Sequence, residues 1–73
     1  EVMQDRSIQI VVNGLKESVP GHSTIASLIA LFGEDDCHLI VEHNGRFVYP
    51  QKYDEIRVCD GDRIEFINPN FGG

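Results

Sequence analysis

Two Asn-Gly pairs, at positions 13–14 and 44–45, constrain the fold of this chain more than any other feature. Each pair follows a short apolar run of the kind found in strands. Asparagine and glycine both tolerate the positive φ that a two-residue hairpin turn requires, so the chain is expected to reverse direction at each pair. The predicted strands of the two hairpins are residues 8–12, 15–19, 39–43 and 46–49.

One amphipathic helix is predicted between the hairpins. Its apolar residues recur at i, i+3, i+4 and i+7 and form a single stripe: Ile25, Leu28, Ile29 and Phe32. Pro20-Gly21 ends the preceding strand, and Ser23 is the expected N-cap, with no Glu or Gln three residues later to complete a capping box. Gly33 is expected to end the helix in the left-handed conformation.

The last predicted strand, residues 63–67, follows the turn at 60–62, whereas 53–58 is ambiguous. One helix laid across a mixed sheet of four or five strands would bury all these faces, which is an α+β architecture. We expect a single domain over residues 1–73, flexible at 1–6, with an extended tail at 68–73. A domain of this size buries roughly 60% of its unfolded surface, which leaves little room for a catalytic cleft.

Charge and cysteine content limit the classes of binding partner and the cellular compartment that are expected. Twelve acidic and six basic residues give a net charge of -6, which disfavours nucleic acid and suits either a basic protein surface or solubility alone. Cys37 and Cys59 stand far apart and are expected to be free thiols in a reducing cytoplasm. No apolar run is long enough for a signal peptide or a membrane helix, so no membrane partner is expected.

Catalytic and metal-binding patterns are weak. His22, His38 and His43 lack the paired spacing of a zinc site, and His43 is expected to be a partly buried strand residue with a hydrogen bond to its ring. Cys37 and His38 are adjacent, and on a strand they would point to opposite faces without contact. The acidic run 34–36 is interpreted as a solvated connector. The prediction is therefore no metal and no bound cofactor.

The tail carries the candidate reactive group. Residues 68–73, Asn-Pro-Asn-Phe-Gly-Gly, are expected to leave the sheet and to reach at most ~20 Å when stretched. Gly72 and Gly73 have no Cβ and can enter a narrow channel of another protein, where Asn70 and Phe71 would contact that partner. The Gly73 carboxylate must be adenylated before sulfur or an amine can displace the leaving group, so an ATP-using partner is expected. The alternative is a frayed end without function.

Residues 8–73 resemble ThiS, the thiamine-pathway sulfur carrier, and more broadly the ubiquitin-like β-grasp carriers. The resemblance implies a β-grasp fold, the same architecture that the strand and helix pattern predicts. The matching segments are IVVNG at 10–14, TIASL at 24–28, VEHNG at 41–45, Val48 with Pro50, DGDRIEF at 60–66 and GG at 72–73.

The resemblance implies a protein cosubstrate rather than an enzyme. A ThiF-like enzyme would adenylate the Gly73 carboxylate with ATP, and sulfur supplied through a cysteine desulfurase would convert it to a thiocarboxylate. A ThiG-like thiazole synthase would accept that sulfur for the thiazole ring of thiamine. Gly72 would let the reacting group enter the narrow channel of a partner, and residues 68–71 would position the tail.

Other readings remain open. Phe71 stands where many relatives have a small residue, and Tyr49 is an extra residue ahead of Pro50, which bears on the identity of the partner. A MoaD-like carrier for molybdopterin, or a carrier for amino acids, tRNA or other metabolites, has a similar fold and terminus. A noncovalent β-grasp interaction module would instead bind through the sheet face, where Val11, Ile40 and Ile67 are expected to be exposed, and would not depend on the tail.

Overall fold

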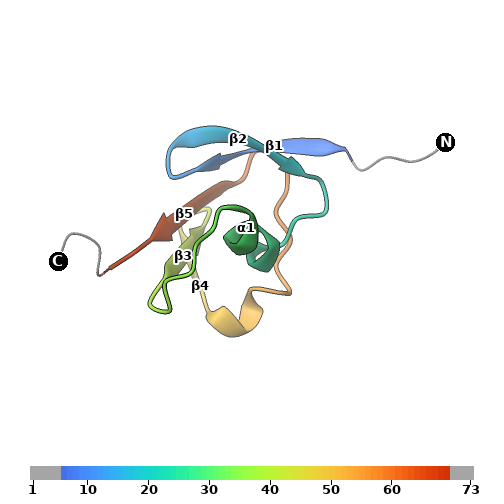
Figure 1. The fold of residues 1–73 in the computed structure, drawn as a ribbon. Helices are drawn as coiled ribbons and strands as arrows, with labels where there is room; N and C mark the ends of the chain where they lie inside the picture. The colour runs from blue at the N-terminus through green and yellow to red at the C-terminus, as the bar shows by residue number, and fades with distance from the viewer. Residues whose placement is uncertain (1–5, 70–73) are drawn as a thin grey trace.

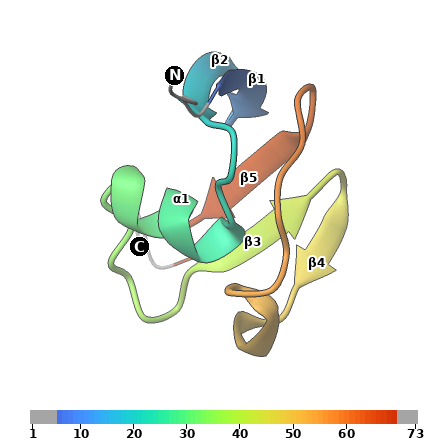
Figure 2. The ribbon, with the colours of Figure 1, turned by 90° about the vertical axis from the view of Figure 1, so that its right-hand side faces the viewer.

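The computed structural model describes residues 6–69 as one five-stranded sheet with a helix packed on one face (Figures 1 and 2). The order across the sheet is β2-β1-β5-β3-β4; β1 and β5 run parallel, and the other neighbouring pairs are antiparallel. The predicted mixed sheet on one helix is confirmed. Its elements are β1 (Ser7–Val12), β2 (Leu15–Pro20), α1 (Ile25–Leu31), β3 (Ile40–His43), β4 (Arg46–Val48), the 3₁₀ turn η1 (Pro50–Lys52) and β5 (Arg63–Ile67).

Both Asn-Gly pairs form the predicted two-residue hairpin turns, and all four residues have positive φ, between 51° and 85°. The asparagine side chains also reach the last strand. Asn13 Oδ1 accepts a hydrogen bond from the Phe66 N–H at 2.7 Å, and Asn44 Oδ1 accepts one from the Arg63 N–H at 2.7 Å. The two turns therefore hold β5 between the hairpins.

The N-cap of α1 is Thr24, so the expectation of Ser23 was wrong by one residue. Thr24 Oγ1 accepts from the Ser27 N–H at 3.1 Å, and Ser27 Oγ accepts from the Thr24 N–H at 2.8 Å. This reciprocal capping box uses a serine in place of the Glu or Gln sought in the sequence. Ser23 is buried instead, and its Oγ donates to the Pro20 carbonyl at 2.7 Å.

The C-terminal end of α1 has the predicted glycine signal. Gly33 has φ +69°, its N–H donates to the Ala30 carbonyl at 3.2 Å, and the Glu34 N–H donates to the Ile29 carbonyl at 3.0 Å. These two bonds form a Schellman motif, which satisfies carbonyls that the helix leaves without partners. The chain leaves α1 in a defined direction toward β3.

The ambiguous stretch 53–58 is not a strand; it passes beside the start of α1. The Ile56 carbonyl accepts from the Ile25 N–H at 3.0 Å, and the Tyr53 carbonyl accepts from the Ala26 N–H at 2.9 Å. These are amide groups of the first helical turn, which have no partner inside the helix. These backbone hydrogen bonds to α1 hold the stretch in place. No regular apolar period is needed for that, and the sequence shows none.

The core lies between α1 and the sheet, as the apolar alternation predicts. The Phe32 and Phe66 rings meet there with centroids 6.2 Å apart. Within residues 6–69, no helix is long and apolar enough to cross a membrane. The buried hydrophobic side chains are Ile10, Val12, Val19, Ile25, Leu28, Val41, Val48, Val58, Ile64 and Phe66.

Candidate functional site

β5 leads the chain toward the predicted reactive tail, and the residue that follows the strand is tied to the helix layer. Asn68 Nδ2 donates a hydrogen bond to Glu34 Oε1 at 3.2 Å, and Glu34 directly follows the glycine that ends α1. This contact orients the chain where it leaves the sheet. The predicted tail residues Asn70, Phe71, Gly72 and Gly73 lie outside the described residues.

An exposed apolar patch lies on the face of the sheet that α1 does not cover. We define the patch as Ile40, Phe47, Tyr49 and Ile67. Ile67 pairs with Ile40 across β5 and β3, and the Phe47 and Tyr49 rings meet edge to face with centroids 4.9 Å apart. Ile67, Phe47 and Tyr49 are 38%, 51% and 62% exposed. The patch therefore borders the last residue of β5, where the tail begins.

The sequence predicted only part of this patch. Ile67 is exposed as expected, whereas Ile40 and Val11 are half-buried. Val11 pairs with Arg63 and lies at the opposite end of β5. Phe47 and Tyr49 were missed, although they flank the buried Val48, and strand alternation would have placed both on the open face.

Two glutamates lie beside the patch on the same face. Glu42 and Glu65 are direct cross-strand neighbours, and each alternates with buried residues that face α1. Like charges in this position are destabilising. Among residues 6–69, neither carboxylate has an ion-pair partner. Among the described residues, the open face thus presents two adjacent carboxylates without ion pairs next to exposed apolar side chains, and Arg63 shares the exposed face of β5 with Glu65.

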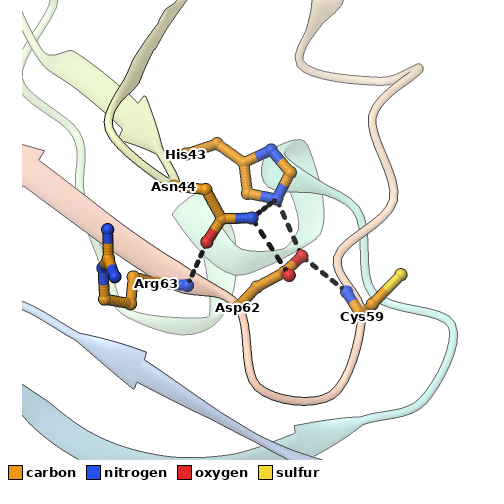
Figure 3. A network of polar contacts seen from close by, with 5 residues as sticks. All are labelled: His43, Asn44, Cys59, Asp62 and Arg63. Carbon is orange, nitrogen blue, oxygen red and sulfur yellow. Dashed lines mark hydrogen bonds and ion pairs between the residues drawn. The ribbon is translucent and has the colours of Figure 1, made fainter.

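A polar network joins the start of β5 to the turn between β3 and β4 (Figure 3). Asp62 is at its centre. Asp62 Oδ2 contacts His43 Nε2 at 2.7 Å and accepts from the Cys59 N–H at 2.8 Å, and Asp62 Oδ1 accepts from Asn44 Nδ2 at 3.1 Å. The predicted hydrogen bond to a partly buried His43 ring is confirmed.

The network is structural rather than catalytic. Burial raises the pKa of the Asp62 carboxyl, but the hydrogen bonds from His43, the Cys59 N–H and Asn44 outweigh burial and lower that pKa below its ordinary value. The carboxylate stays ionised, and the Cys59 thiol points away from the imidazole (Figure 3). Among the five residues of this network, no nucleophile is therefore presented to the histidine.

Cys37 and His38 correct another expectation. Residues 37 and 38 lie in a turn between α1 and β3 rather than on a strand, so alternation does not separate them. Cys37 Sγ lies 3.5 Å from His38 Nδ1. Cys37 and Cys59 are both free, exposed thiols, as predicted.

The ThiS family model matches residues 4–73. The chain belongs to the ThiS family. The ThiS match includes Gly72 and Gly73 as well as the whole described fold. No curated protein matches the chain. As a ThiS-family member, it is a small carrier protein rather than a catalyst.

A solved ThiS structure supports the same assignment. The thiamine biosynthesis protein ThiS from Geobacter metallireducens has a TM-score of 0.78 and 28% sequence identity to this chain. The match covers 90% of this chain and 100% of that one. The expected ThiS-type, ubiquitin-like β-grasp fold is therefore confirmed.

Proposed function

We propose that this chain carries sulfur as a thiocarboxylate on Gly73 and donates it to the thiazole ring of thiamine. The ThiS family match over residues 4–73 carries this proposal. The similar protein from Geobacter metallireducens is itself described as a thiamine biosynthesis protein. The Asn68–Glu34 contact, which orients the chain beyond β5, supports a tail that projects toward a partner.

The chemistry requires activation in a partner. A ThiF-like enzyme binds ATP and transfers AMP to the Gly73 carboxylate, with release of pyrophosphate. Persulfide sulfur supplied through a cysteine desulfurase then displaces AMP, and reductive cleavage of the sulfur–sulfur bond by a thiol leaves the thiocarboxylate. A ThiG-like thiazole synthase takes that sulfur. We propose that the chain itself binds no cofactor in these steps and that they take place in the cytoplasm.

We propose that the open face docks the activating enzyme. The patch, defined above, offers apolar area at the root of the tail, while Glu42 and Glu65 suit a partner surface that carries Arg or Lys. A basic side chain inserted between the two carboxylates would relieve their repulsion only in the complex. The same contact would lead the tail toward the catalytic channel.

The deciding experiment measures the intact mass of the chain after incubation with ATP, a sulfide source and the ThiF-like enzyme of the same cell. We expect a gain equal to the replacement of one oxygen by sulfur, located at the C-terminus. A variant that lacks Gly73 should show no gain. An unchanged mass, with the enzyme active on a known carrier, would contradict the proposal.

A second candidate function is a noncovalent interaction module, which the exposed patch favours. Such a module binds its partner through the sheet and does not need the last two residues. Deletion of Gly72 and Gly73 discriminates between the two functions. A module should still bind its partner without these two residues, whereas a carrier should lose all activity.

A further inference from the structure

The connector between α1 and β3 brings three metal-ligating side chains together. Asp36, Cys37 and His38 each offer one donor atom, and these atoms all lie within 4.8 Å of one another. Cys37 Sγ is 3.5 Å from His38 Nδ1, and His38 Nδ1 is 3.7 Å from Asp36 Oδ1. The proposed carrier chemistry uses none of the three.

Two of the three donor separations resemble those around a tetrahedral zinc ion, and the Cys37 and Asp36 donors lie within 4.8 Å of each other. With bonds of about 2.3 Å to sulfur and about 2.0 Å to nitrogen, a tetrahedral ion holds the two donors about 3.5 Å apart. The Cys37–His38 pair already has that spacing, at 3.5 Å. A nitrogen and a carboxylate oxygen on the same ion lie about 3.3–3.5 Å apart, so the His38–Asp36 pair needs only a small adjustment.

The cluster is held locally and is accessible. The Asp36 carboxylate accepts a hydrogen bond from the His38 N–H at 2.8 Å, which fixes the turn that gathers the three side chains. Cys37 and His38 are exposed. Asp36 and Cys37 also line a surface cleft of about 270 Å³, where Glu34 and Asp35 add negative charge that attracts cations.

We propose that Asp36, Cys37 and His38 form a three-ligand site for a divalent transition metal of the zinc class. Thiolate, imidazole and carboxylate are ligands that zinc accepts together, and a three-ligand protein site leaves a fourth position for water or a partner's donor. Binding displaces the thiol proton of Cys37 to solvent, since the thiolate is the ligand. The site is independent of the proposed sulfur transfer at Gly73.

Titration of the full, reduced chain with Co²⁺ tests this site. We expect a thiolate-to-cobalt charge-transfer band that saturates at one metal per chain and is lost when Zn²⁺ is added. Cys37→Ser should abolish the band, and Cys59→Ser, which removes the other exposed thiol, should leave it unchanged. His38→Ala and Asp36→Asn should each weaken Co²⁺ binding more than about tenfold, a loss that even an outer-shell partner can cause.

The control for His38 is His22→Ala, and thermal unfolding of each variant verifies that it is folded. Absence of the band, or a band that follows Cys59, would overturn the site. So would Co²⁺ affinity that is insensitive to His38 and Asp36, because a lone thiol would then explain the binding. A saturation point of one metal per two chains would likewise overturn a three-ligand site within one chain.

Discussion

The Asp62 side chain connects the β3–β4 turn to the segment that precedes β5. Its two oxygens contact His43, Asn44 and the Cys59 N–H, so it joins the β3–β4 turn to the segment before β5. Only 16% of its side chain is exposed. Hydrogen bonds to a charged acceptor are the stronger kind, and their loss leaves several donors without a partner.

We predict that Asp62→Asn destabilises the fold by about 1–2 kcal/mol at pH 7. Because the folded-state pKa of Asp62 is lowered, its contribution is present above the unfolded value, near 3.9, and is lost as pH falls through the folded value. The stability difference between the two proteins should therefore shrink below about pH 3.9. Urea unfolding from pH 7 to pH 2.5 measures this difference.

Asp54→Asn is the matched control, since Asp54 is exposed. Its stability should lie within about 0.5 kcal/mol of the parent protein. An equal loss in both variants, or a penalty for Asp62→Asn that does not change with pH, would contradict the role of the carboxylate.

At the residue scale, the sequence predicts whether a side chain is buried and hydrogen-bonded better than it predicts which residue is its hydrogen-bond partner. A hydrogen bond to His43 was predicted from its strand position, but Asp62 lies 19 residues away and no local rule identifies it. The contact between Cys37 and His38 was missed for a different reason. A strand was assumed where the chain makes a turn, and the orientation of neighbouring side chains follows from that choice.

At the element scale, each Asn-Gly turn has two functions. It reverses a hairpin, and its asparagine accepts a backbone hydrogen bond from β5 at 2.7 Å. β5 runs between the two hairpins and donates one such bond from the Arg63 N–H and another from the Phe66 N–H. The two turn asparagines thereby fix the position of β5 relative to both hairpins.

We predict that Asn13→Gly costs about 1 kcal/mol, because glycine keeps the positive φ and loses only the side-chain bond to Phe66. Asn44→Gly should cost more, because it loses both the bond to Arg63 and the Nδ2 bond to Asp62. Asn13→Ala should cost about 1 kcal/mol more, since alanine is also strained at positive φ. Chemical unfolding measures both losses. Amide exchange should accelerate at Phe66 in Asn13→Gly and at Arg63 in Asn44→Gly. Equal stability of the glycine variants and the parent would show that the side-chain bonds contribute nothing.

Element boundaries were predicted to within one or two residues where a local signal exists. Strand β5 matches its predicted range of 63–67, and the glycine that ends α1 was identified correctly. The start of α1 was placed one residue early because Ser23 and Thr24 are both good caps. Burial of Ser23 decides between them, and burial depends on the packed fold.

At the scale of the whole molecule, the sheet has one covered and one open face. The covered face packs against α1 (Figure 2). The open face carries the patch, Glu42 and Glu65. Exposed aromatic side chains of this kind are the residues that contribute most when an interface forms. This open face is therefore the surface that we propose contacts the activating enzyme.

We predict that Phe47→Ala lowers kcat/KM for thiocarboxylate formation by about tenfold, mainly through KM, because it removes docking area without touching the tail. Leu31→Ala is the matched control; Leu31 is 57% exposed but lies on α1, on the other side of the sheet. Steady-state assays with the ThiF-like enzyme measure both variants. Equal losses in the two, or none in Phe47→Ala, would contradict docking through the open face.

The sequence alone determined the two hairpins and the amphipathic helix, because turn chemistry and apolar period act within a few residues. The mixed sheet followed from the need to bury these apolar faces together, and the family was indicated by the resemblance of several short segments. Only the tertiary structure decided which distant groups meet. The row formed by Ile67 and Ile40, the contact of Asp62 with His43 and the bond from Asn68 to Glu34 all depend on strand order and register. Packing of the whole core sets that register, so no local pattern could specify it.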